Sequence, residues 1–85
     1  MFPHWLVTRG LINGKCFRRP AWPANCFIKF SDNKLQAIGA PDVSRTEVEI
    51  RPQPYTYQDL VSWLEIMLWH EDYMAEDWQV YIVPT

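Results

Sequence analysis

The strongest hydrophobic pattern in the chain lies between residues 56 and 69. Apolar residues recur there at i, i+3, i+4, i+7 and i+8, the spacing of one apolar helix face. Thr56 precedes this run, and Asp59 lies three residues after Thr56, which is the spacing of a capping box. The spacing predicts a helix from about residue 57 to residue 69. The apolar positions are Leu60, Trp63, Leu64, Met67 and Leu68.

Alternation of apolar and polar residues predicts strands in other parts of the chain. Cys26, Ile28 and Phe30 fall on one face of a predicted strand, so Phe27 and Lys29 share the other face. A weakly amphipathic helix is predicted near the N-terminus of the chain, and Asn13 and Gly14 end it. The predicted strands cover residues 16–18, 26–30, 34–38, 46–51 and 78–83, the weak helix covers 4–12, and 70–77 can add a helical turn.

These elements predict an α+β fold with a small, mostly antiparallel sheet, one main helix (about 57–69) and a C-terminal strand. The length of 85 residues favours a single small domain over residues 1–85. Five Trp, four Tyr and four Phe are more large rings than so small a core can enclose. We therefore expect some of these rings to line a cleft or an interface, and we expect a homo-oligomer, a dimer or a tetramer.

Charge is distributed unevenly along the chain. Residues 1–55 hold eight basic and four acidic residues, a net +4, whereas residues 56–85 hold six acidic and no basic residues, a net −6. Either the two segments attract each other within the fold or between subunits, or the basic segment meets an anionic ligand. No signal peptide or membrane span is predicted, so we expect a cytoplasmic protein with reduced Cys16 and Cys26.

Enzyme signatures are missing from the sequence. It has no glycine-rich phosphate loop, no HExxH and no CxxC. A nucleophile–base pair could form between one cysteine, Cys16 or Cys26, and one histidine, His4 or His70, but the predicted strand positions of the cysteines favour buried structural roles. The same four residues could form a zinc site, but the two cysteines are ten residues apart, which is wider than the usual ligand spacing. We therefore expect no catalysis, no cofactor and no metal. The acidic residues of 71–77 favour a solvated face, with a partner-binding patch as the alternative.

A tryptophan in a proline-bounded turn offers a candidate binding residue. Trp22 stands between Pro20 and Pro23, where its ring could stack on a flat ligand or cover the edge of the core. Arg18, preferred weakly over Arg19, could hold a phosphate, because adjacent strand residues face opposite ways. The predicted ligand-binding set is Trp22, Arg18, Asn25, whose amide can donate and accept, and Phe27 as a second ring.

Two further residues are expected to be structural. Trp78 begins the predicted last strand, where an inward ring would anchor that strand to the main helix. Asp77 could accept hydrogen bonds from backbone N–H groups of a neighbouring turn.

Two segments in the same order resemble a family of small phage proteins, the Thoeris anti-defence two family. Residues 14–22, GKCFRRPAW, resemble its opening pattern, and residues 72–80, DYMAEDWQV, resemble its closing pattern around Asp77 and Trp78. The chain departs from the family at Ala21, where glycine is usual, in the weaker N-terminal helix, and in the longer helix before the closing motif.

The resemblance implies an oligomeric protein without catalysis. Such proteins bind a cyclic nucleotide signal, such as a cyclised ADP-ribose made by a bacterial TIR-domain enzyme, and keep it from its effector. The expected partner is then this signal molecule, with neither nucleic acid nor a membrane involved. The alternative is a phage inhibitor that binds a host defence protein directly through its acidic, aromatic-rich surface.

Overall fold

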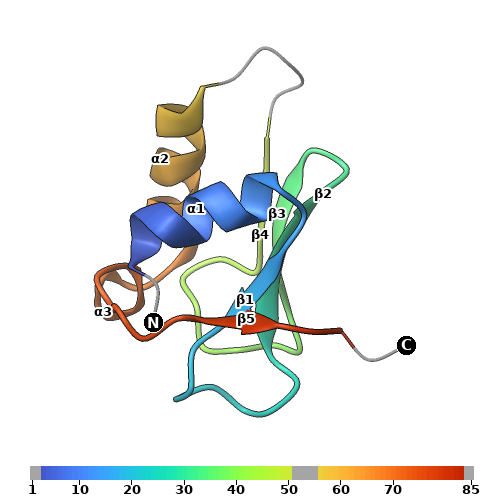
Figure 1. The fold of residues 1–85 in the computed structure, drawn as a ribbon, viewed down its shortest axis with the longest axis vertical. Coiled ribbons are helices and arrows are strands. Elements are labelled where there is room, and N and C mark those ends of the chain that lie inside the picture. Colours follow the sequence, from blue (N-terminus) through green and yellow to red (C-terminus); the bar gives the residue numbers. More distant parts are fainter. Residues whose placement is uncertain (1–2, 51–55, 84–85) are drawn as a thin grey trace.

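The computed structural model describes residues 3–50 and 56–83, and these form a five-stranded antiparallel sheet with helices on one side (Figure 1). The strand order is β4-β3-β2-β1-β5. The predicted α+β fold is confirmed. The elements are α1 (His4–Ile12), β1 (Cys16–Arg18), β2 (Phe27–Ser31), β3 (Lys34–Ile38), β4 (Glu47–Glu49), α2 (Tyr57–Met67), α3 (His70–Tyr73) and β5 (Gln79–Tyr81).

The main helix α2 begins at the predicted capping box. The Thr56 side chain accepts from the Asp59 N–H, and the Asp59 carboxylate accepts in turn from the Thr56 N–H. The helix ends at Met67, two residues earlier than predicted, because Leu68 adopts an extended conformation. Leu68 remains buried, so its place in the apolar pattern reflects core packing beyond the helix end.

The hairpin of β2 and β3 sets which residues face the helices. Its turn places Asp32 and Asn33 at positive φ, the conformation that matches the twist of a tight two-residue hairpin. The register pairs Ile28 with Ala37, and both belong to the buried core. It also pairs Phe27 with Ile38 and Lys29 with Gln36 on the opposite face, which no helix among the described residues covers.

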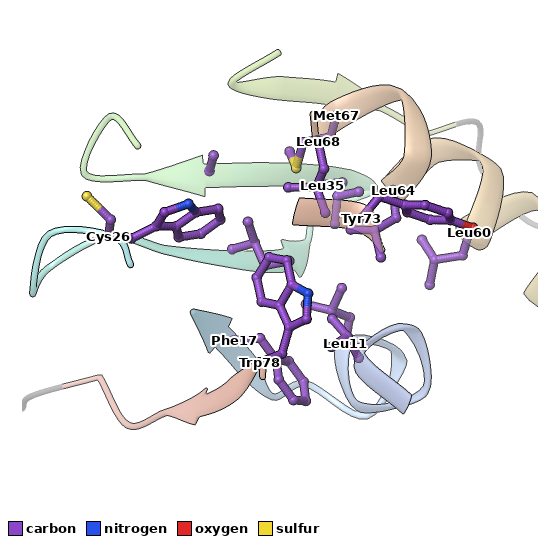
Figure 2. Packing of buried hydrophobic residues seen from close by; sticks show 14 of the residues in the cluster. Leu11, Phe17, Cys26, Leu35, Leu60, Leu64, Met67, Leu68, Tyr73 and Trp78 are labelled. Atoms are coloured by element: carbon purple, nitrogen blue, oxygen red, sulfur yellow. The ribbon is translucent and has the colours of Figure 1, made fainter. Parts of the chain in front are cut away.

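The core lies between this sheet and the helices. Figure 2 shows Trp78 and Phe17 near Leu11 of α1, and all three are almost fully buried. Gly10 faces the Phe17 ring so closely that a Cβ atom at this position would collide with it. The glycine that weakens the helical pattern of residues 4–12 therefore lets α1 approach β1.

The outer strands are shorter than the alternation predicts. Strand β4 covers Glu47–Glu49 within the predicted 46–51, although Ile50 is still buried, and residue 51 lies outside the described residues. Strand β5 covers Gln79–Tyr81 within the predicted 78–83. No helix in the described parts of the chain is long and apolar enough to cross a bilayer.

Candidate functional site

The turn that carries Trp22 points its ring into the protein. The Trp22 side chain is 8% exposed and belongs to the core cluster. Its ring lies 5.2 Å from that of Trp78, with the two planes at 88°. This placement favours the second of the two roles considered for Trp22, covering the edge of the core, and removes the ring from the candidate ligand site.

The Arg18 side chain forms hydrogen bonds with the backbone of the same turn. Its Nη2 donates to the Trp22 carbonyl oxygen at 2.7 Å and to the Pro23 carbonyl oxygen at 3.3 Å. These two bonds fix the turn through Nη2 alone, whereas the buried Nε of Arg18 has no hydrogen-bond partner among the described residues. Asn25 lies exposed in the turn and does not line the depression beside Tyr81 that is described below. The structure brings Arg18 beside Phe27 on one sheet face, whereas the Trp22 ring lies in the core, so the four predicted ligand residues do not form one site.

Arg19 joins the basic segment to the acidic one. Its Nη1 lies 2.7 Å from an Asp72 carboxylate oxygen, and its Nε lies 3.0 Å from a carboxylate oxygen of Asp77. The hydrogen bond with Asp77 raises the pKa of Arg19, and the same bond lowers the pKa of Asp77 although partial burial opposes it. Part of the charge asymmetry in the sequence is therefore neutralised inside the fold.

The Asp77–Trp78 motif belongs to the same internal network. Trp78 is fully buried, and its Nε1 donates to the Asp72 carbonyl oxygen at 3.0 Å. The main partner of Asp77 is the Arg19 guanidinium, where the sequence suggested backbone N–H groups of a turn. The two residues therefore fasten the start of β5 to α3 and to the turn after β1.

The helix-free face of the sheet carries a stacked pair of aromatic rings. Phe27 of β2 and Tyr81 of β5 come from the strands on either side of β1. Their ring centroids are 4.5 Å apart and their planes differ by 12°. Phe27 is buried at 8% exposure, whereas Tyr81 is partly exposed. Tyr81 therefore presents the accessible ring, and Phe27 supports it.

An open depression of about 430 Å³ lies beside Tyr81 at the β5 edge. This volume is within the usual range for small-molecule sites, about 300–1,000 Å³. Most of its lining is apolar or backbone, so it suits the flat part of a ligand better than a charged group. The lining residues are Gly14, Lys15, Cys16, Val80, Tyr81, Ile82 and Val83.

A cation lies next to this depression on the same face. The register that pairs Phe17 with Ile28 places Cys16 beside Lys29 and Arg18 beside Phe27. Burial raises the pKa of the Cys16 thiol, and the Lys29 charge lowers it in part. Cys16 is therefore mainly a neutral thiol at pH 7. The site combines one accessible ring and a neutral thiol with two ammonium groups, Lys15 in the lining of the depression and Lys29 beside it.

The sequence pattern placed Phe27 and Lys29 on one strand face, but it did not bring Tyr81 or Cys16 to that face. The alternation of residues 78–83 does place Tyr81 on the strand face opposite Trp78, and this was the only hint in the sequence that Tyr81 faces away from the core. That signal does not say which strand borders β5, and β5 lies two strands away from β2. The neighbouring β1 had to be known before the two rings could be brought together.

The described residues hold no group of three or more His, Cys, Asp or Glu side chains arranged to bind a metal ion. Cys26 is a free, buried thiol that donates to the Gly39 carbonyl oxygen. Comparisons with known proteins find no matching family model, no matching curated protein and no matching solved structure.

Proposed function

We propose that this chain is a cytoplasmic binding protein, without catalysis, that sequesters a cyclic nucleotide signal such as a cyclised ADP-ribose. The anti-defence role and the class of ligand rest on the resemblance to the Thoeris anti-defence two family. The structural observation that carries the proposal is the Phe27–Tyr81 stack beside the depression and Lys29.

Each part of this face suits one part of a nucleotide-like ligand. The outer side of the Tyr81 ring offers a stacking platform for a base, and stacking of this kind contributes about 1–3 kcal/mol per base. The Lys29 ammonium lies near Cys16 and suits a phosphate as a point charge. The ligand site is thus proposed on the helix-free sheet face, and it replaces the site at the Trp22 turn that the sequence suggested.

Differential melting tests this function. A ligand at about 100 times its dissociation constant adds roughly 2.7 kcal/mol to the free energy of unfolding. We expect cyclised ADP-ribose to raise the Tm of the wild type and to raise that of Lys29→Ala less. Lys34→Ala is the matched control, because Lys34 pairs with Ser31 on the same sheet face but at the far end of β2.

An unchanged Tm of the wild type with cyclised ADP-ribose and with other cyclic nucleotides contradicts the proposal. If the ligand raises the Tm of Lys29→Ala and of Lys34→Ala equally, the protein still binds the ligand, but the phosphate does not lie at Lys29.

The second candidate, direct binding to a host defence protein, is favoured by a different surface. Glu71 and Glu76 remain exposed while Asp72 and Asp77 are held by Arg19. Trp69 and Met74 are exposed in the same segment, at 46% and 52%. Charge reversal at Glu71 distinguishes the two functions: it should weaken capture of such a protein and leave nucleotide binding intact.

A further inference from the structure

The two edge strands of the sheet differ in how they are protected. Strand β4 exposes two glutamates, Glu47 and Glu49, along its short length. Strand β5 and the two residues after it, 79–83, contain no charged residue. Val80, Ile82 and Val83 are exposed there at 37%, 81% and 47%.

An open strand edge presents unpaired backbone N–H and C=O groups, which readily pair with another strand. Charged side chains on an edge strand discourage such pairing, and β4 has them. The β5 edge has none, and apolar side chains extend past it to Val83. The β4 edge therefore carries charges that discourage pairing with another strand, and the β5 edge does not.

We propose that a second copy of this chain pairs its β5 antiparallel with this β5, which joins two five-stranded sheets into one. An antiparallel pair of identical strands is self-complementary, as a twofold-symmetric interface requires. The charges near the two ends of β5 agree with this arrangement. Glu76 is exposed before β5 begins, and the exposed Lys15 lines the depression near the other end of β5.

Antiparallel pairing turns the Glu76 end of one strand toward the Lys15 end of its partner. Opposite charges therefore approach at both ends of the interface, while the uncharged residues lie between them. A parallel arrangement would instead bring Glu76 toward Glu76 and Lys15 toward Lys15, with like charges at each end.

This inference deepens the proposed function. The pairing of two β5 strands stands by itself, but its effect on the ligand rests on the proposed function, because β5 lines the ligand depression. The partner strand would lie against the outer edge of Val80, Tyr81 and Ile82 and form a further wall of the depression. A shallow site on one chain would thereby become a cleft between two chains, which is a common location for a ligand site.

Sedimentation velocity of the wild type and of Val80→Lys/Ile82→Lys tests the interface. Two copies of this variant bring four lysines into one strand pair, where like charges repel. We expect a dimer or larger species for the wild type and a 10.1 kDa monomer for the variant. Glu47→Lys/Glu49→Lys is the control, because it places two lysines on the opposite edge and should leave the assembly unchanged.

Far-UV circular dichroism establishes that each variant is folded. If the double variant fails to fold, Ile82→Lys alone serves instead, because the Ile82 side chain is 81% exposed. A monomeric wild type overturns the inference, and so does an assembly that survives these lysines. Ligand binding separates the two claims. A monomer that binds the nucleotide overturns only the interface, whereas a β5-dependent dimer that binds none overturns only the proposed function.

Discussion

The rings of Trp22 and Trp78 meet nearly at right angles, with their planes at 88° and their centroids 5.2 Å apart. Perpendicular aromatic pairs of this kind add about 0.5–1.5 kcal/mol beyond the area that they bury. The two tryptophans come from two segments that are far apart in the sequence, residues 14–22 and 72–80. Their contact shows that these segments form a structural unit at one end of the core.

Replacement of Trp22 by alanine should therefore destabilise the fold. Removal of a buried tryptophan costs about 3–5 kcal/mol, because a cavity remains in the core. For a domain of this size, Tm should fall by more than about 10 °C, as measured by thermal circular dichroism. Nucleotide affinity of the folded variant at low temperature should be close to that of the wild type. A variant that melts normally but loses the ligand would restore Trp22 to the binding site.

Arg19→Ala should be almost as destabilising. Asp72 would be left with its carboxylate buried at 7% side-chain exposure and without the guanidinium. We expect a loss of about 3 kcal/mol, the lower end of the range for removal of one partner from a buried ion pair. Chemical denaturation at pH 7 measures it. A loss as small as that from Arg45→Ala, at an exposed position, would show that the pair contributes little.

The Arg19–Asp77 bond also predicts a pH dependence. Because Arg19 lowers the pKa of Asp77 in the folded chain, the stabilisation is fully present above the pKa of an unfolded aspartate. It is lost as the pH falls through the lower pKa of the folded state. The free energy of unfolding of the wild type should therefore decline below about pH 4. Asp77→Asn should show a weaker decline, and equal declines would exclude this contribution.

Gly10→Ala should destabilise the protein although alanine is the better helix former. The new methyl group would collide with the Phe17 ring, and overpacking of this kind costs about 1–3 kcal/mol. Gly14→Ala is the matched control, since nothing lies within 4 Å of its Cβ position and only its positive φ opposes the change. Urea denaturation of both variants checks this. A more stable Gly10→Ala would show that α1 does not pack on Phe17 as described.

Cys16 should react slowly with alkylating reagents at neutral pH. Burial raises the pKa of its thiol, and the Lys29 charge offsets part of that increase. The alkylation rate should rise with pH through the alkaline range and should be slower still in Lys29→Ala. Cys26→Ala is used as the background, so that mass spectrometry follows a single thiol. Faster alkylation in Lys29→Ala would place Lys29 away from Cys16.

The sequence predicted elements whose cause is local. The capping box of Thr56 and Asp59 is visible in four consecutive residues, and it forms as predicted. Alternation likewise placed Phe27 and Lys29 on the face opposite Ile28. The end of α2 was predicted too late because burial continues at Leu68 after the helical conformation has stopped.

Relations between distant segments could not be predicted in this way. A proline-bounded turn indicates rigidity at Trp22, but the direction of its ring depends on Trp78, which is 56 residues further along the chain. The stack of Phe27 on Tyr81 depends on β1 lying between their two strands. Both relations follow from the order of strands in the sheet, and the hydrophobic pattern does not contain that order.

The proposed ligand site is tested most directly by calorimetric titration of cyclised ADP-ribose into the wild type, Tyr81→Phe and Tyr81→Ala. The account predicts that the wild type binds, that Tyr81→Phe keeps its affinity, and that Tyr81→Ala binds about 5- to 150-fold more weakly, as expected for loss of one stacking ring. Mass spectrometry should recover the ligand unchanged. Absence of binding by the wild type, equal affinity in a folded Tyr81→Ala, or conversion of the ligand would contradict the account.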